Sequence, residues 1–204
     1  VAAAEAFELA AAALPSPPNF AMCFVSVDNA LMTDVPEAVW GTMIRQPGVT
    51  NPVMLGSAVR FQKPGNGHVQ VLAGTIPDLS VDTFTLDYEP SAEELWDPAR
   101  PAPFMGMCFV DPKLAITHEG VVGNHLHNLS KKLKGQVPIV GNVCAPIHQK
   151  DGTDKGSMFF FNDTIYNGSA AIALLRSKMV EAQVRNVVPS IGLSKGTVTA
   201  LKTS

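Results

Sequence analysis

The residues of this chain that could carry out chemistry include one cysteine and one histidine placed close together. Cys144 and His148 are four residues apart, and a histidine beside a cysteine can activate it as a nucleophile. Pro146 interrupts the helical geometry that would bring the two side chains onto one face. No orienting acid or oxyanion-binding group stands at a suitable spacing, so we expect no catalytic residue and no enzyme activity.

Histidines can also ligate a metal ion, and the sequence has five of them. Four lie within one stretch: His118, His125, His127 and His148. His125 and His127 are two residues apart in a predicted helix, so they lie on opposite, solvated flanks and cannot share an ion. The run 151–154 is similar to part of a calcium loop but lacks the distal glutamate. We expect no metal ion and no cofactor.

Two glycine-containing segments are the best candidates for a binding site. Gly56-Ser57 and Gly141-Asn142-Val143-Cys144 belong to apolar segments that begin with proline, and we expect them at strand ends. Glycine there lets the backbone turn tightly and present N–H groups to an anion or a carboxylate. The alternative is that glycine permits close packing between two halves of the protein. The candidate ligand-binding residues are Gly56, Ser57, Gly141, Asn142 and Cys144.

Trp96 is the candidate interface residue. It lies in residues 89–103, a segment rich in proline and acidic side chains that is typical of a connector with one helical turn at 92–96. A tryptophan in such a segment fits a partner contact and local packing equally well.

The elements that would position these residues occur twice. Met22-Cys23-Phe24-Val25 recurs letter for letter as Met107-Cys108-Phe109-Val110, 85 residues later. A helix-like stretch follows each copy, and then an apolar segment that begins at Pro52 or Pro138. This order predicts an α/β fold of two similar strand-helix-strand halves, an internal duplication, with mixed β-sheets and helices packed outside. The first unit is 1–88 with an N-terminal helix, 89–103 is the connector, and 104–204 is the second unit.

Hydrophobic periodicity and turn residues place the individual elements. Helices are predicted over 1–14, 34–46 and 120–134. Strands are predicted over 20–27, 52–59, 68–73, 81–88, 104–110, 137–143, 157–162, 164–166, 169–175 and 180–188. The apolar helix faces are Val39, Trp40, Met43 and Ile44, and then Val122, Leu126, Leu129 and Leu133. Each half is expected to hold its own largely buried sheet.

Charge and hydropathy exclude several classes of protein. The 204 residues are 46% apolar and 16% charged, with a net charge of −3. No basic run exceeds 131–134, so nucleic acid is not an expected partner. No apolar stretch approaches the ~18 residues that cross a bilayer. The low charged fraction favours burial of some surface against a protein partner.

The N-terminus and the cysteines indicate the compartment. The first four residues, Val-Ala-Ala-Ala, resemble the stub left at a plastid transit-peptide cleavage site. Three cysteines are an odd number, and Cys23 and Cys108 fall at matching places in the repeated strands, as small buried apolar residues do. We expect an intracellular, soluble protein with a plastid as its candidate compartment.

The order of short motifs in both halves resembles the FIST domain (F-box and intracellular signal transduction). The matching segments are 52–58, 75–77, 138–142, Phe159–Asp163, Gly168 with the strand 171–175, and 188–199. The resemblance covers nearly the whole chain and corresponds to the family's N-terminal domain alone. It implies a sensory, non-catalytic module that binds small ligands such as amino acids. The chain departs from the family where 186–192 replaces a Gly-Cys-Arg-Pro-Ile-Gly run, and it has no C-terminal FIST domain.

These features together predict a non-enzymatic binding or docking module. We expect an accessory subunit of a larger protein assembly, with a plastid complex as one candidate. The alternative is a small-ligand sensory domain in signal transduction, whose ligand would be anionic or amino-acid-like.

Overall fold

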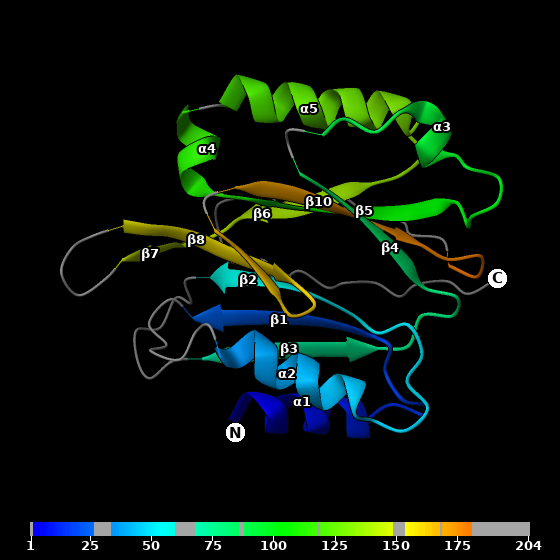
Figure 1. Ribbon diagram of the computed structural model, residues 1–204, viewed down its shortest axis with the longest axis vertical. Coiled ribbons are helices and arrows are strands. Elements are labelled where there is room, and N and C mark those ends of the chain that lie inside the picture. The colour runs from blue at the N-terminus through cyan, green and yellow to red at the C-terminus, as the bar shows by residue number, and fades with distance from the viewer. Residues whose placement is uncertain are drawn as a thin grey trace, which may run out of the picture.

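Two mixed β-sheets lie face to face between two groups of helices, which confirms the α/β prediction (Figure 1). The computed structural model describes residues 2–26, 34–59, 68–85, 88–117, 119–148, 154–167 and 169–180. Several predicted features lie outside these residues: positions 151–153 of the calcium-loop-like run, His118, Gly168, most of the predicted strand 180–188 and the family-like segment 188–199.

The first sheet has the strand order β3-β1-β2-β8-β7, and β9 also pairs with β8. Its strands are β1 Phe20–Ser26, β2 Val53–Val59, β3 Val69–Gly74, β7 Pro146–His148, β8 Asp154–Phe161 and β9 Thr164–Asn167. β1 and β2 are parallel because the helix α2, Asp34–Ile44, provides the crossover between them. The other strand pairs of this sheet are antiparallel.

The second sheet has the strand order β4-β10-β5-β6. Its strands are β4 Ser80–Thr85, β5 Pro103–Val110, β6 Ile139–Val143 and β10 Ala170–Arg176. β5 and β6 are parallel, and the crossover between them contains α4, Pro112–Thr117, and α5, Glu119–Lys132. A short helix, α3, Ala92–Leu95, lies in the connector, as the sequence predicts.

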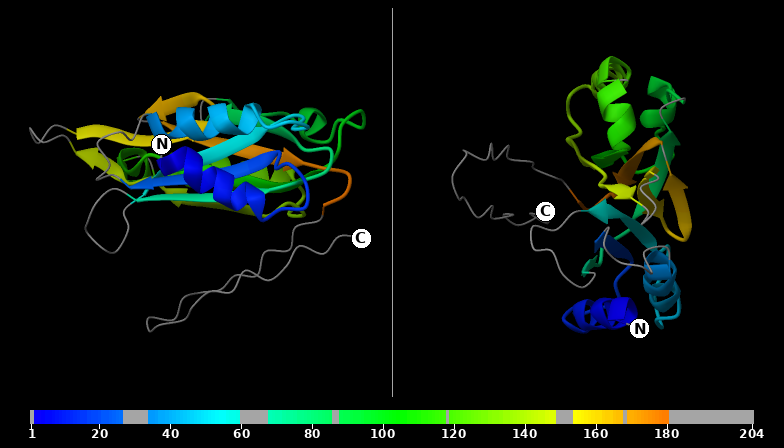
Figure 2. Two further views of the ribbon diagram at one scale, coloured as in Figure 1. Left: turned by 90° about the horizontal axis from the view of Figure 1, so that it is seen from below. Right: turned by 90° about the vertical axis from the view of Figure 1, so that its left-hand side faces the viewer.

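Three hydrophobic clusters fill the spaces between the layers. The first lies between the first sheet and the helices α1 (Ala2–Ala12) and α2, and includes Phe7, Val39 and Phe160. The second lies between the two sheets and includes Leu55, Phe109 and Phe159. The third lies between the second sheet and α5 and includes Leu129, Leu133 and Ile172. Figure 2 shows the two helix groups on opposite sides of the sheets, so the central strands are apolar on both faces.

The two halves of the chain exchange strands. β8, from the second half, pairs with β2, and β4, from the first half, pairs with β10. Each sheet therefore contains strands from both halves, in contrast to the expectation of one sheet in each half. Periodicity shows which face of a strand is buried, but it does not identify the strand's neighbour.

A few local predictions differ from the structure. Neither α4 nor β7 is predicted, since both are too short to show a periodic apolar face. In α4, the Asp111 carboxylate accepts a hydrogen bond from the Lys113 N–H at 2.7 Å, which stabilises the first turn. Ile44, predicted to be buried on α2, is 50% exposed. Val39 and Met43 occupy the centre of that face, and Ile44 lies at its margin on the last residue of the helix.

The repeated sequences occupy equivalent positions in the two sheets. In the parallel pair β1–β2, Cys23 lies opposite Gly56, and in the parallel pair β5–β6, Cys108 lies opposite Gly141. On their other sides β1 and β5 each have an antiparallel neighbour, β3 and β10. The two three-strand groups thus share their pairing and register. An internal duplication of the whole chain stays a prediction.

Candidate functional site

The two candidate glycines lie inside strands, so the expectation that they form strand-end loops is wrong. Gly56 lies within β2, and Gly141 is the central residue of β6. A Cβ atom at Gly56 would lie 1.9 Å from the carbonyl oxygen of Cys23, and one at Gly141 would lie 2.1 Å from that of Cys108. Both distances are far shorter than any real Cβ contact. Glycine is therefore needed here for close approach of the neighbouring strand, which supports the packing alternative.

Three other predicted residues meet where the two sheets join. The Asn142 Nδ2 group donates a hydrogen bond to Ser57 Oγ at 3.2 Å, and Cys144 Sγ lies 4.0 Å from Asn142 Oδ1. The Ala145 N–H donates to the Ala58 carbonyl at 3.0 Å, so the chain passes from the second sheet onto the first. Ser57 is fully buried. A partly buried polar pair at this junction fixes how the two sheets meet.

Cys144 is a protonated thiol rather than an activated nucleophile. It is buried, and burial raises its pKa to about 12. Burial also raises the pKa of Cys23 to about 12 and that of Cys108 to about 11. Because the thiolate is the reactive form, none of these thiols is prepared for attack at neutral pH. The side chain of His148 lies outside the described residues.

The histidines on α5 differ from their predicted placement. His127 is exposed, but His125 is buried, and its Nε2 atom has no hydrogen-bond partner. The segment that contains Glu89 and Trp96 packs along this side of α5, which removes the flank from solvent. Within the described ranges, no three His, Cys, Asp or Glu side chains are close enough together to hold a metal ion.

Trp96 packs within its own chain. Its indole N–H donates to the Lys132 carbonyl at 2.8 Å, at the end of α5, and Lys134 Nζ lies 5.1 Å from the centre of its ring. Lys132 Nζ also pairs with Glu89 at 2.9 Å, and this ammonium lowers the pKa of that carboxyl. These contacts support local packing, the alternative to a partner contact.

The sequence analysis missed a buried ionic network. Arg176, at the end of β10, is fully buried, and its Nε donates to Asp82 Oδ2 at 2.7 Å. Its Nη1 donates to the Pro101 carbonyl at 2.9 Å, and Arg100 pairs with the same Asp82 carboxylate. The signal in the sequence is a single arginine that ends an otherwise apolar strand. The network attaches the connector to the second sheet.

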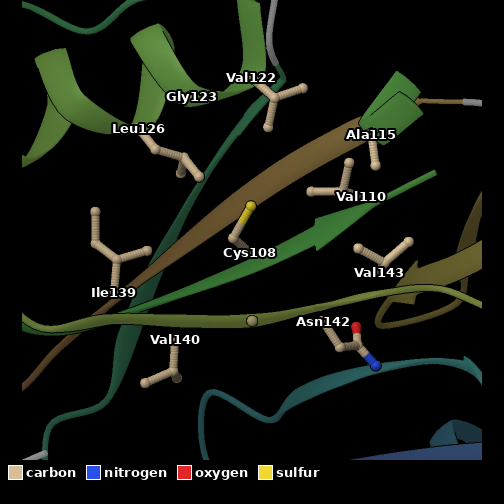
Figure 3. A pocket seen from close by; sticks show the side chains of 11 residues that line it. Cys108, Val110, Ala115, Val122, Gly123, Leu126, Ile139, Val140, Asn142 and Val143 are labelled. Carbon is tan, nitrogen blue, oxygen red and sulfur yellow. The ribbon is translucent and has the colours of Figure 1, made fainter. Parts of the chain in front are cut away.

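A cavity of about 460 Å³ lies between α5 and the second sheet (Figure 3). It is lined by Cys108, Val110, Ala115, Val122, Gly123, Leu126, Ile139, Val140, Gly141, Asn142 and Val143. In Figure 3 the Cys108 sulfur points toward α5, while Val140 and Asn142 point to the opposite face of β6. None of the lining residues is charged, so the cavity is chemically apolar.

The cavity lies beside the edge of the second sheet. β6 is the last strand of that sheet, and among the described residues it pairs with β5 alone. Val143 of β6 and Val121 of α5 are both 56% exposed. Both lie on the elements that border the cavity, so apolar surface extends beyond it.

No protein family model matches the sequence, and no curated protein matches it. In the part of the chain that the structure describes, no helix is long and apolar enough to cross a membrane.

Proposed function

We propose that this protein is a non-enzymatic binding module of the FIST N-terminal type, whose binding site is the cavity beneath α5. The observation that carries the proposal is the cavity itself, whose volume of about 460 Å³ falls within the ~300–1,000 Å³ range of ligand sites. Gly141, one of the residues proposed as ligand-binding from the sequence, lines it, and Asn142 borders it with its side chain turned to the opposite face of β6.

The lining determines what the cavity accepts. A free amino acid carries an ammonium and a carboxylate, and this cavity would desolvate both without a charged partner. An uncharged, apolar group avoids that penalty and gains the free energy of leaving water. The cavity therefore supports docking of an apolar side chain from a protein partner, and the module would act as an accessory subunit of a larger intracellular assembly.

Small-ligand sensing is the second candidate function, and the cavity volume favours it. The ligand would be neutral and apolar rather than an amino acid. The native mass of the protein from its source separates the two functions. A mass well above 21.6 kDa with co-migrating polypeptides supports docking, whereas a monomer with a small bound adduct supports sensing.

Two glycines of α5 allow a controlled test of the cavity. A Cβ at either Gly123 or Gly120 meets no atom within 4 Å, but only Gly123 lines the cavity. Gly123→Leu should therefore fill the cavity, and Gly120→Leu should leave it open. Gly141→Val is unsuitable because its side chain would collide with the carbonyl of Cys108.

The neutral dye Nile red serves as the probe, and its fluorescence enhancement reports the dissociation constant. We expect Gly123→Leu to weaken dye binding at least about tenfold, and Gly120→Leu to bind as the wild type does. Equal affinity in both variants would show that the dye binds elsewhere and would refute the assignment of this cavity.

A further inference from the structure

We infer that the occupant of the cavity is an extended peptide of a partner protein, which adds to β6 as an antiparallel strand and places an aromatic side chain over Gly141. This inference rests on the proposed function, since it names the class of partner for the same site. It comes from a comparison of the two equivalent strand groups.

In the first sheet, the position beside β2 is occupied. β8 pairs with β2 in antiparallel register and places Phe160 opposite Gly56. The ring covers the glycine so closely that a Cβ at Gly56 would lie 2.4 Å from Phe160 Cε2. Phe160 and Cys23 belong to the same cluster, on the side of the sheet that faces α1 and α2. One aromatic side chain thus fills the space over this glycine.

In the second sheet, the equivalent position is open. β6 pairs with β5 in the register that β2 has with β1, but in the described ranges no strand lies on its outer side. Gly56 is buried whereas Gly141 is exposed, and Ala58 is 0% exposed whereas its equivalent Val143 is 56% exposed. The cavity takes the place that Phe160 has in the first sheet, because it lies over Gly141 on the side that faces the helix.

Addition of a strand would pair the outward main-chain groups of β6 and would fill the cavity beside it. The outward N–H and C=O groups of β6 are a template for another strand, and main-chain hydrogen bonds would provide affinity. The cavity would provide specificity, since burial of one aromatic side chain removes roughly 150–250 Å² from water. Residues 181–204 contain no Phe, Tyr or Trp, so this segment does not supply the aromatic group.

The β8 sequence itself provides the probe. The test peptide is Lys-Gly-Ser-Met-Phe-Phe-Phe-Asn-Asp, the sequence of residues 155–163, and the control peptide carries the Phe160→Ser change. Displacement of Nile red reports occupancy of the cavity, because the peptide side chain and the dye compete for the same apolar lining. Amide hydrogen exchange of β6 reports strand addition.

We expect the test peptide to raise the apparent dissociation constant of Nile red at least fivefold and to protect the β6 amides that face away from β5. The control peptide should do neither, and Gly123→Leu should abolish both effects while Gly120→Leu keeps them. If Nile red binds but the test peptide has no effect, the cavity is a small-ligand site, and strand addition is refuted while the binding module stands. If neither binds, both proposals fail.

The chain's own C-terminal segment and a second copy of the protein are two other candidate occupants of the β6 edge. Each gives a distinct result, and either result would refute the assignment to a partner protein. If the chain's own C-terminal segment covers β6, the β6 amides are protected without peptide, and Val184→Asp with Val188→Asp in the full chain exposes them. If a second copy covers β6, protection without peptide increases with protein concentration.

Discussion

Replacing Asp82 by alanine should destabilise the fold strongly, because it removes the counter-ion of a fully buried arginine. Arg176 is 0% exposed, and its Nε lies 2.7 Å from Asp82 Oδ2. Without Asp82, the guanidinium keeps two carbonyl acceptors among the described residues, Pro101 at 2.9 Å and Glu94 at 3.4 Å. Carbonyls accept hydrogen bonds but carry no net charge, so the buried cation would be left uncompensated.

The magnitude follows from the burial of the pair. Removing one partner of a buried ion pair typically costs about 3–5 kcal/mol, a large part of the ~5–15 kcal/mol that holds a domain folded. For a chain of this length each kcal/mol lowers the melting temperature by about 2–4 °C, so we expect a decrease of roughly 6–20 °C. Urea denaturation followed by circular dichroism gives the free energy of unfolding, and scanning calorimetry gives the melting temperature.

Two further variants isolate the charge effect. Arg100 contacts the same carboxylate, but its side chain is 37% exposed, so Arg100→Ala should cost less than about 1 kcal/mol. Adding Arg176→Met to Asp82→Ala removes the unpaired charge, and the double variant should be more stable than Asp82→Ala alone. A loss below about 1 kcal/mol for Asp82→Ala, or a double variant less stable than the single one, would refute the account of this network.

Three further predictions test packing, ionisation and helix termination. Gly141→Ala should lower the free energy of unfolding by about 1–3 kcal/mol through its collision with a strand carbonyl, whereas Gly123→Ala should raise it by about 0.5–1 kcal/mol in an open helical position. Urea denaturation measures both, and effects of the same sign would contradict the packing argument. Raising the pH above 9 should destabilise the protein, because the Cys144 thiol loses its proton at about pH 9 when unfolded but near pH 12 when folded. Stability from this group is complete below pH 9 and falls by up to ~1.4 kcal/mol per pH unit as the pH rises. Cys144→Ser should give a shallower decline, and an identical slope would show that the thiol is not the cause. Trp96→Phe should cost about 1 kcal/mol by removing the 2.8 Å hydrogen bond to Lys132, and unchanged amide exchange in the last turn of α5 would argue against that role.

Local structure could be predicted because it depends on local patterns. Val122 and Leu129 lie on one face of α5 as their spacing predicts, since the period of a helix is present in the sequence itself. The turn at α3 is likewise local, because the capping box between Ser91 and Glu94 needs only residues three positions apart. Periodicity is less accurate at the margin of a buried helix face. Ile44 follows the buried Met43 by one residue, and that step around the helix leaves it exposed.

The candidate site could be predicted only in part, because its geometry depends on pairing between distant strands. Gly141 and Asn142, which the sequence proposes as ligand-binding residues, lie at the cavity, but the Asn142 side chain points to the opposite face of β6, and their role as ligand-binding residues stays a prediction. Glycine is needed at position 141 because the carbonyl of Cys108 lies beside it, and no local pattern in the sequence places that carbonyl there. The pairing of Arg176 with Asp82 joins residues far apart in sequence and is equally invisible to periodicity. Among the described residues β6 has no strand on its outer side, and the absence of a neighbouring strand leaves no pattern in the sequence.

The exchange of strands between the two halves has a consequence for synthesis of the protein. β2 leaves the ribosome with its outer edge unpaired, and the β8 residues that cover it follow about 100 residues later. At roughly 5–20 residues per second, the nascent chain would expose that edge for about 5–20 seconds. The first half therefore cannot complete its sheet until β8 has been synthesised, and the β2 edge is the segment where a holding chaperone would act.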